Sequence, residues 1–185
     1  YPDIPKGYQI SQYKYPLVSG GSLNGVAITR VHLEEDTARS SHDRGDYSLI
    51  DFNRAGIPLM ELVTEPVVKS AEEASAFARE LQLLLRYLGA GDANMEKGEM
   101  RVEANISVSK NTTKDPTKDR PSLAHEGRSF VGELGTKVEV KNINSFKFAK
   151  DAIDYEIERQ IEIVEDGGKV IQETRLFDSA KGITQ

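Results

Sequence analysis

Three consecutive carboxylates end the segment Arg30-Val-His-Leu-Glu-Glu-Asp36. Carboxylate oxygens are the ligands that Mg²⁺ prefers, and substrate phosphates commonly complete its coordination shell. A further acidic residue, Glu61, interrupts the apolar run Leu59-Met-Glu-Leu-Val63. Two carboxylates 4 Å apart repel each other by about 4 kcal/mol at an effective dielectric near 20, so they converge only where a cation or a proton offsets the repulsion. The two segments are therefore candidates for a metal site.

Each feature also has an ordinary structural explanation. Glu34–Asp36 is typical of a solvated turn, Glu61 of a buried ion pair, and His32 of a packed core side chain. The alternation of side chains along a strand adds a constraint, because Glu35 has the parity of Leu33. Glu35 therefore reaches the polar face only if the strand has ended or bulged before it. Both interpretations stay open at this point.

A second polar set comes from two segments with sharp β alternation, Met100 to Ser109 and Lys137 to Lys141. The polar side chains on one face are Arg101, Glu103 and Asn105 in the first segment and Lys137, Glu139 and Lys141 in the second. If the strands are neighbours, this face could hold a metal ion and neutralise a triphosphate. A polar sheet face is more commonly just the solvated side, so the pattern alone leaves the choice open.

The elements that would position these residues do not alternate regularly. A helix is predicted from the capping box of Ser70 and Glu73 to Gly89, and a second one from about Ser145 to Asp166. Extended segments are predicted at Val26 to Leu33, Ser48 to Asn53, Pro58 to Thr64, Met100 to Ser109, Lys137 to Lys141 and residues 169–177. Sharp alternation favours an α+β fold, an antiparallel β-sheet with helices packed on one face, over a doubly wound parallel sheet.

Composition narrows the function classes. The chain has 185 residues, no Cys and a net charge of −6. This length fits one domain, the lack of Cys excludes disulfides and thiolate metal sites, and the acidic balance disfavours broad adhesion to nucleic acid. No apolar run has membrane-spanning length, and the P-loop, nucleophile-elbow and HExxH motifs are absent. Residues 110–134 are predicted to form a flexible insertion. Since the chain starts at Tyr1, we expect it to be part of a longer protein.

Six motifs together resemble a known family. They are YPDIPKGYQISQY (1–13), ITRVHLEED (28–36), DFNRAGIPLMELVTEP (51–66), RVEANISV (101–108), GTKVEVKNINSF (135–146) and QETRLFD (172–178). In this order, and over nearly the whole chain, they are similar to the B subunit of the glutamine-dependent aspartyl/glutamyl-tRNA amidotransferase. The third motif is long and specific.

The resemblance implies that residues 1–185 are part of an ATP- and Mg²⁺-binding cradle domain similar to the catalytic domain of glutamine synthetase. It further implies phosphorylation of the side-chain carboxylate of Glu-tRNA(Gln) or Asp-tRNA(Asn). Ammonia from glutamine, released by an A subunit, then gives Gln-tRNA(Gln) or Asn-tRNA(Asn) for translation. A small C subunit completes the heterotrimer.

Site residues follow from the matching motifs. The resemblance implies Glu35 and Glu61 as metal ligands, Glu103, Glu139 and Lys141 as catalytic residues, and Arg101, Lys137 and Asn105 as cofactor-binding residues. The family's N-terminal G-L-E-x-H stretch is absent, so we expect the chain alone to be inactive. Position 103 more often carries Asp in the family.

Two alternative functions remain. One is a non-catalytic tRNA-binding or assembly module of the same complex, which the acidic balance disfavours. The other is a free-standing ligase of glutamine-synthetase type, for which the sequence offers no substrate pocket. We expect a bacterial cytoplasmic location, with the mitochondrial matrix as the alternative, and no membrane partner.

Overall fold

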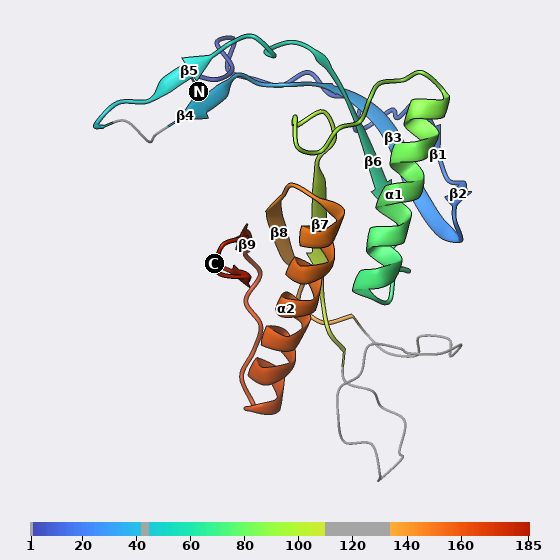
Figure 1. Cartoon of the computed structure of the whole chain (residues 1–185), viewed down its shortest axis with the longest axis vertical. Helices are drawn as coiled ribbons and strands as arrows, with labels where there is room; N and C mark the ends of the chain where they lie inside the picture. The colour runs from blue at the N-terminus through green and yellow to red at the C-terminus, as the bar shows by residue number, and fades with distance from the viewer. Residues whose placement is uncertain (1, 42–44, 110–133) are drawn as a thin grey trace. The chain divides into compact units, whose positions relative to one another are not determined.

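Strands and helices follow one another irregularly in the computed structural model, which describes residues 2–41, 45–109 and 134–185 (Figure 1). Among these residues the strand pairs are antiparallel, except that β8 and β9 run parallel. The predicted α+β fold is confirmed. The predicted insertion at 110–134 lies outside the described residues apart from Leu134. None of the helices in the described ranges is long and apolar enough to span a membrane.

Residues Tyr1–Val67 form one compact unit, called unit 1 here, and Val68–Gln185 form another, called unit 2. We expected a single cradle domain over 1–185, and this assignment stays a prediction, since two compact units can belong to one domain. The strands of unit 1 are β1 (Val18–Ser19), β2 (Ser22–Leu23), β3 (Val26–Glu35), β4 (Arg39–Ser41), β5 (Leu49–Asp51) and β6 (Pro58–Thr64). β3 pairs with β1, β2 and β6, and β4 pairs with β5.

The pairing of β3 with β6 sets which side chains share a face. The register shifts once, between Ile28 and Arg30, and from there it is regular, with His32 opposite Glu61 and Glu35 opposite Pro58. The strand runs two residues beyond the predicted end at Leu33. Because side chains alternate along a regular strand, Glu34 lies on the face of His32 and Glu35 lies on the other face.

Unit 2 combines a sheet with two helices, one packed on the sheet and the other packed against the first helix. Its elements are α1 (Ala71–Tyr87), β7 (Val102–Ile106), β8 (Val138–Ile143), α2 (Phe146–Glu165), β9 (Thr174–Asp178) and β10 (Ile183–Thr184). The strand order is β10-β9-β8-β7. Helix α2 packs on β7, β8 and β10, and α1 packs against α2. The sheet therefore has one face covered by helix and one face left for polar side chains.

The apolar faces predicted from alternation form this core. Val138 and Val140 of β8 are fully buried, as is Ala152 of α2. Ile106 of β7 and Ile157 of α2 belong to the same buried cluster. The predicted apolar stripes of β7, β8 and α2 are confirmed, since burial of alternate residues on strands and of i, i+4 residues on the helix puts them in one core.

Both helices begin and end where the sequence predicted. The Ser70 hydroxyl accepts from the Glu73 N–H at 3.1 Å, although the Glu73 carboxylate accepts from the Lys69 N–H at 2.7 Å rather than from Ser70. Ser145 caps α2 in the same way, accepting from the Phe148 N–H at 3.0 Å. Gly89, with φ of +68°, follows the end of α1 in the left-handed conformation that glycine adopts at low cost.

A buried carboxylate on α2 holds the β9–β10 edge of the sheet. Glu156 is fully buried and accepts hydrogen bonds from Arg159 at 2.7 and 2.9 Å, Gln160 at 2.9 Å and the Thr184 hydroxyl at 2.7 Å. Arg175 of β9 in turn donates to the Thr184 hydroxyl at 2.9 Å. Burial alone would raise the pKa of Glu156, but these donors together hold its pKa below the ordinary value of 4.5.

Replacing Glu156 with Gln is expected to lower the free energy of unfolding by about 3 kcal/mol at neutral pH, because Arg159 loses its buried carboxylate. Since the folded-state pKa is lowered, the stabilisation is present above pH 4.5 and is lost as the pH falls through the lowered pKa. Urea unfolding across pH measures both effects.

The matched control is Glu158→Gln on the exposed side of α2, which is expected to change stability by less than about 0.5 kcal/mol. A difference between wild type and Glu156→Gln that stays constant down to about pH 3 would contradict the assigned role.

Candidate functional site

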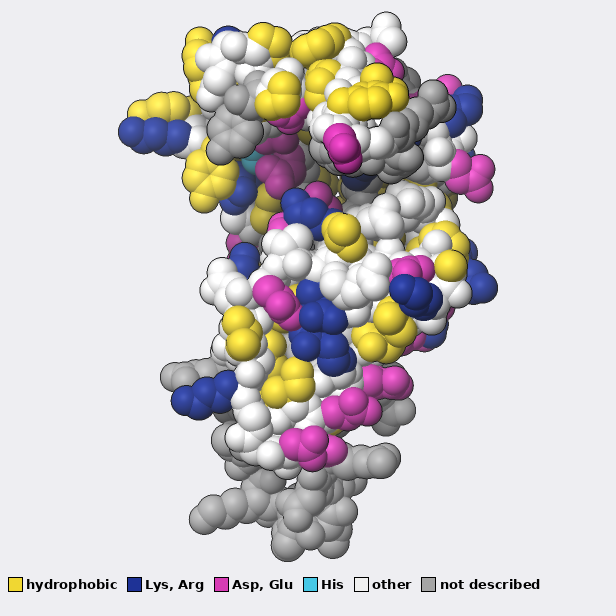
Figure 2. All heavy atoms as spheres, turned by 90° about the vertical axis from the view of Figure 1, so that its left-hand side faces the viewer, with side chains coloured by type: hydrophobic (Ala, Val, Ile, Leu, Met, Phe, Trp, Pro, Cys, Tyr) yellow, Lys and Arg dark blue, Asp and Glu magenta, His cyan; other side chains and the backbone are white. Residues whose placement is uncertain are grey.

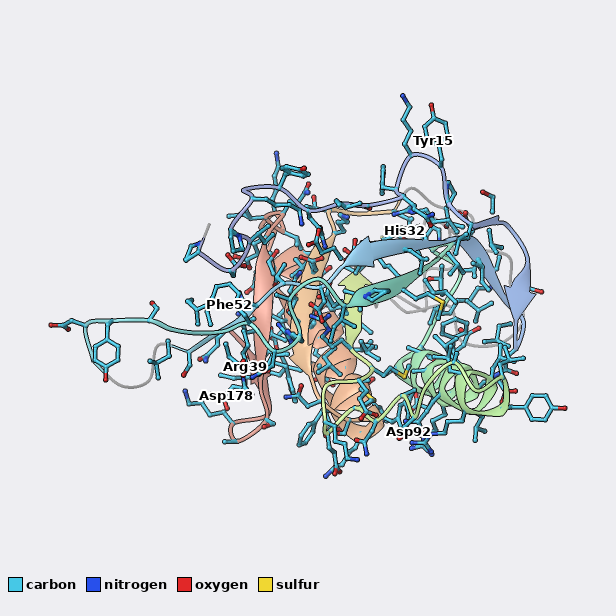
Figure 3. The ribbon with its side chains drawn as sticks, turned by 90° about the horizontal axis from the view of Figure 1, so that it is seen from above. Tyr15, His32, Arg39, Phe52, Asp92 and Asp178 are labelled. Carbon is cyan, nitrogen blue, oxygen red and sulfur yellow. The ribbon has the colours of Figure 1, made fainter. Side chains whose placement is uncertain are left out.

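The β3–β6 pair of unit 1 gathers one imidazole and two carboxylates. Ligand atoms of His32, Glu34 and Glu61 all lie within 4.8 Å of one another. His32 Nε2 lies 3.0 Å from Glu61 Oε2 and 3.6 Å from Glu34 Oε2. Figure 3 labels His32 on the long strand beside β6. We call these three residues the acidic cluster.

The acidic cluster combines a buried member with accessible ones. The His32 side chain is 1% exposed, whereas that of Glu61 is 48% exposed. Nε2 of His32 faces the carboxylates, and its Nδ1 is buried without a hydrogen-bond partner in the described part of the chain. His32 Nε2 lies in contact with the Glu61 carboxylate at 3.0 Å, so the buried ring limits the positions that this carboxylate can take. The sequence left His32 open between packing and metal coordination. The structure shows that the side chain is buried and that its Nε2 lies beside the two carboxylates, and coordination stays a prediction.

The structure does not bring Glu35 together with Glu61. The Glu35 carboxylate pairs with Lys6 and accepts from the Ile10 N–H at 3.3 Å. The hydrogen bond from Lys6 is the main cause that holds the pKa of Glu35 below its ordinary value. Metal binding by Glu35 was implied by the family resemblance and is untested, but the geometry puts its neighbour Glu34, and not Glu35, on the face of Glu61. The physical reason is that β3 continues without a bulge past Leu33.

The polar face of unit 2 brings together the three predicted catalytic residues. Lys141 Nζ lies 3.3 Å from Glu103 Oε1 and 3.7 Å from Glu139 Oε2. These residues come from β7 and β8, which pair antiparallel with Asn105 opposite Glu139. The two strands are therefore neighbours, which the sequence had left as a condition. Lys141 offsets part of the repulsion between the two carboxylates.

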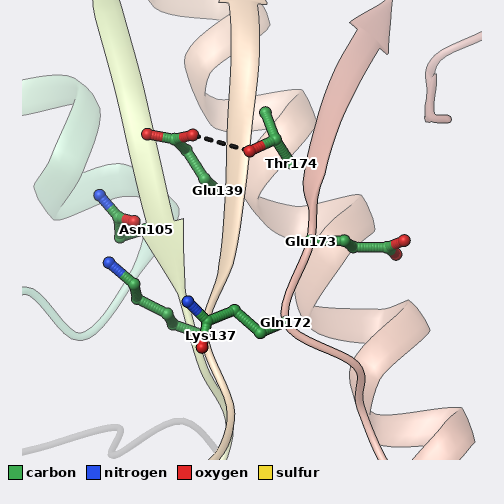
Figure 4. Close-up of a pocket in the computed structure, with 6 residues that line it drawn as sticks. All are labelled: Asn105, Lys137, Glu139, Gln172, Glu173 and Thr174. Atoms are coloured by element: carbon green, nitrogen blue, oxygen red, sulfur yellow. Dashed lines mark hydrogen bonds between the residues drawn. The ribbon is translucent and has the colours of Figure 1, made fainter.

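A polar pocket of about 230 Å³ lies on this face. Its lining residues are Asn105, Lys137, Glu139, Gln172, Glu173 and Thr174 (Figure 4). The Thr174 hydroxyl donates to Glu139 Oε2 at 2.9 Å, across the parallel β8–β9 pair. In Figure 4 the Lys137, Asn105 and Gln172 side chains lie on the same side of the strands, while the Glu173 side chain points away. Since typical ligand pockets measure roughly 300–1,000 Å³, this one suits a phosphoryl or carboxylate group.

Two predicted cofactor-binding residues lie just outside the strands. Lys137 directly precedes β8 and lines the pocket, and Arg101 directly precedes β7 and is exposed. Asn105, the third, lies within β7 and also lines the pocket. Cofactor binding by these residues stays a prediction.

Sequence reasoning missed several residues that the structure places at these sites. Glu34 would have been found by extending the alternation of β3 through Glu35, since His32 and Glu34 have the same parity. Gln172 and Thr174 belong to the motif at 172–178, for which the sequence indicated no role. Their position at the pocket depends on the parallel pairing of β8 with β9, which no local sequence pattern predicts.

Comparison with known proteins decides the family. The model of the GatB/GatE catalytic domain matches residues 1–185. The chain belongs to this family. Relatives include the B subunit of the aspartyl/glutamyl-tRNA(Asn/Gln) amidotransferase from Thermodesulfovibrio yellowstonii, 49% identical over 195 residues, and those from Geotalea daltonii, 47% over 197, and Syntrophotalea carbinolica, 48% over 193. Each alignment covers 100% of this chain.

The resemblance that the motifs predicted is thereby confirmed. The chain spans 37% of the length of each of these relatives, so it corresponds to part of such a protein. The family match extends over both units, and the acidic cluster and the polar pocket therefore both lie within the catalytic domain that the family model describes.

Replacing Lys6 with Met is expected to raise the pKa of Glu35 towards 4.5, because the main hydrogen bond that lowers it is lost. Replacing Glu61 with Gln is expected to leave the pKa of Glu35 unchanged, since the two carboxylates lie on different faces of the β3–β6 pair. Carboxyl ¹³C shifts across a pH titration measure both values. If Glu61→Gln moves the pKa of Glu35 as far as Lys6→Met does, the assignment of faces is wrong.

Proposed function

We propose that the chain is part of the catalytic domain of a tRNA-dependent amidotransferase. It activates the side-chain carboxylate of Glu-tRNA(Gln) or Asp-tRNA(Asn) with ATP, and ammonia then displaces phosphate to give the amide. The observation that carries this proposal is the acidic cluster, in a chain of the GatB/GatE catalytic domain family. Relatives named as the B subunit of an amidotransferase support it.

The acidic cluster fits a divalent cation. Two carboxylates within 4.8 Å of each other repel unless a positive charge or a proton lies with them. In the described residues of unit 1 no Lys or Arg forms a recorded ion pair with Glu34 or Glu61, unlike Glu103 and Glu139 with Lys141. Mg²⁺ prefers oxygen ligands, so Glu34 and Glu61 would hold it and His32 would orient Glu61.

Magnesium bound there would polarise the phosphates of ATP and neutralise the charge that develops on them. Side chains of the chain itself would bind and position the reacting groups. Lys137 and the amides of Asn105 and Gln172 supply donors in the pocket for a phosphoryl or carboxylate group. Lys141 keeps Glu103 and Glu139 close together, and the Thr174 hydroxyl fixes one oxygen of Glu139. Such preorganised groups need no rearrangement when charge develops.

Activation by phosphorylation has a chemical reason. A free carboxylate is a poor acceptor for ammonia, whereas an acyl phosphate carries a good leaving group. Phosphoryl transfer itself depends mainly on positioning and charge neutralisation. The ammonia would come from glutamine through an A subunit, with a small C subunit completing a heterotrimer in the bacterial cytoplasm.

A non-catalytic tRNA-docking role is the alternative that this proposal must exclude. Faces that bind RNA are rich in basic residues, and the chain has a net charge of −6. Figure 2 shows acidic and basic side chains interspersed on the face that it presents. A pure docking module would show no Mg²⁺-dependent binding of ATP when the complete subunit is titrated.

Replacing Glu34 or Glu61 with Gln in the complete complex is expected to lower amidation on the order of 100-fold, because each change removes a carboxylate from the metal site. Glutamine hydrolysis by the A subunit is expected to continue. Ammonia release and formation of amidated tRNA are measured side by side.

The matched control is Glu35→Gln, the neighbouring carboxylate on the other face of β3. Its amidation rate is expected to stay within roughly 3-fold of wild type, since it removes no group of the acidic cluster. Full activity of the Glu34 and Glu61 variants would refute the proposed site. Equal damage by all three would refute the choice of Glu34 over Glu35.

A further inference from the structure

Arg30 is a cation beside the acidic cluster that has no ionic partner recorded in the described residues. It lies on β3 two residues before His32, and the pairing with β6 is regular from Arg30 to Glu35. Arg30, His32 and Glu34 therefore share one face, with neighbours about 6.6 Å apart along the strand. The Arg30 Nε is buried and has no hydrogen-bond partner within the ranges described.

An aromatic ring holds the Arg30 guanidinium in place. Its central carbon lies 4.4 Å from the centre of the Tyr13 ring. The same ring meets His32 edge-on, with ring centres 6.0 Å apart and an interplanar angle of 89°. Stacking on an aromatic face uses the flat side of the guanidinium and leaves its N–H groups, which point outward in the plane, available to an acceptor.

The position of Tyr13 is itself fixed by β3. The Gln12 N–H donates to the Leu33 carbonyl at 2.8 Å, and the Leu33 N–H donates to the Gln12 side-chain oxygen at 3.0 Å. Ser11 forms a β-bridge with Glu34, and its hydroxyl accepts from the Tyr13 N–H at 3.2 Å. Tyr13 is therefore placed by the strand that carries Arg30, and the stacked pair is built into unit 1.

The arrangement favours an anionic ligand. A guanidinium has five N–H donors, and leaving a buried one unpaired costs free energy unless a ligand accepts from it. Two carboxylates lie on the same face, yet no ion pair joins Arg30 to either Glu34 or Glu61 in the described residues. Donors held in a fixed plane next to a candidate metal site would suit an oxyanion bound beside that site.

We propose that Arg30, stacked on Tyr13, binds an oxyanion of the substrates next to the acidic cluster, with the nucleotide phosphates as the first choice of source. This inference rests on the proposed function, because the oxyanion belongs to the reaction that the acidic cluster would serve. The second source of the same chemistry is the side-chain carboxylate of the aminoacyl-tRNA.

The test uses the full-length subunit in its assembled complex. Arg30→Gln removes the charge and three of the donors, and Arg30→Lys keeps the charge without the planar fork. The matched control is Arg79→Gln, because Arg79 also lies over an aromatic ring, that of Phe146 at 5.5 Å, but on α1 of unit 2. Calorimetric titration with ATP and with inorganic tripolyphosphate, both in Mg²⁺, gives affinities, and steady-state kinetics give KM for ATP and for misacylated tRNA.

The expected result is that Arg30→Gln weakens ATP and tripolyphosphate binding by about 10- to 100-fold, the size of one lost charge-assisted contact. Arg30→Lys is expected to recover only part of this loss, and Arg79→Gln to behave as wild type. A rise in KM for misacylated tRNA with unchanged ATP binding would support the oxyanion site and assign it to the carboxylate. If Arg30→Gln matches Arg79→Gln in every affinity and KM, the proposal is overturned.

Two further measurements keep the outcomes separate. If Arg30→Gln lowers the Tm of the complex, Arg30→Met is titrated in place of Arg30→Gln. The Met variant keeps an apolar stem over the Tyr13 ring but has no charge and no N–H donors. If the wild-type complex shows neither ATP binding nor ATP-dependent amidation, the proposed function fails. If the wild type is active, Glu61→Gln is inactive and Arg30→Gln is unchanged, only the present inference fails.

Discussion

The antiparallel register between β3 and β6 is the constraint on which the candidate metal site depends. It sets His32 opposite Glu61 and, since the strand continues to Glu35, it puts Glu34 on the same face. If the register of β3 against β6 shifted by one residue, the side chains on the face of Glu61 would be those of the other parity of β3, and Glu35 would take the place of Glu34. Repulsion between the two carboxylates then calls for a cation or a proton, and the buried imidazole of His32 lies 3.0 Å from the Glu61 carboxylate.

In unit 2, the repulsion between two neighbouring carboxylates is partly offset by a lysine. Lys141 pairs with both Glu103 and Glu139, so a side chain of the chain itself offsets part of the repulsion between the two carboxylates. The pocket on the same face keeps donors for an anion. Behind this face, fully buried Glu156 ties α2 to β10, and Arg175 of β9 joins the same hydrogen-bonded network. The same strand β9 carries Thr174, whose hydroxyl donates to Glu139 Oε2.

Local patterns predicted much of this structure, and long-range pairing explains what they missed. The cap at Ser70, the helical spacing of apolar residues after Ser145 and the alternation around Val138 predicted the helices and the core, because these signals depend on neighbouring residues alone. The family resemblance implied Glu35 rather than Glu34, and this choice required the strand to end or bulge before Glu35. The strand instead continues to Glu35, because its pairing with β6 continues that far. Glu156 stood on the helical stripe but went unnoticed, since its burial depends on partners from β9 and β10.

The central claim is that Glu34 and Glu61 hold a divalent cation together. Anomalous diffraction from crystals of the full-length subunit soaked in Mn²⁺, as a substitute for Mg²⁺, tests it most directly. The account predicts a peak within about 2.5 Å of carboxylate oxygens of both residues. A fully occupied manganese ion bound through Glu35, with no peak between Glu34 and Glu61, would contradict it.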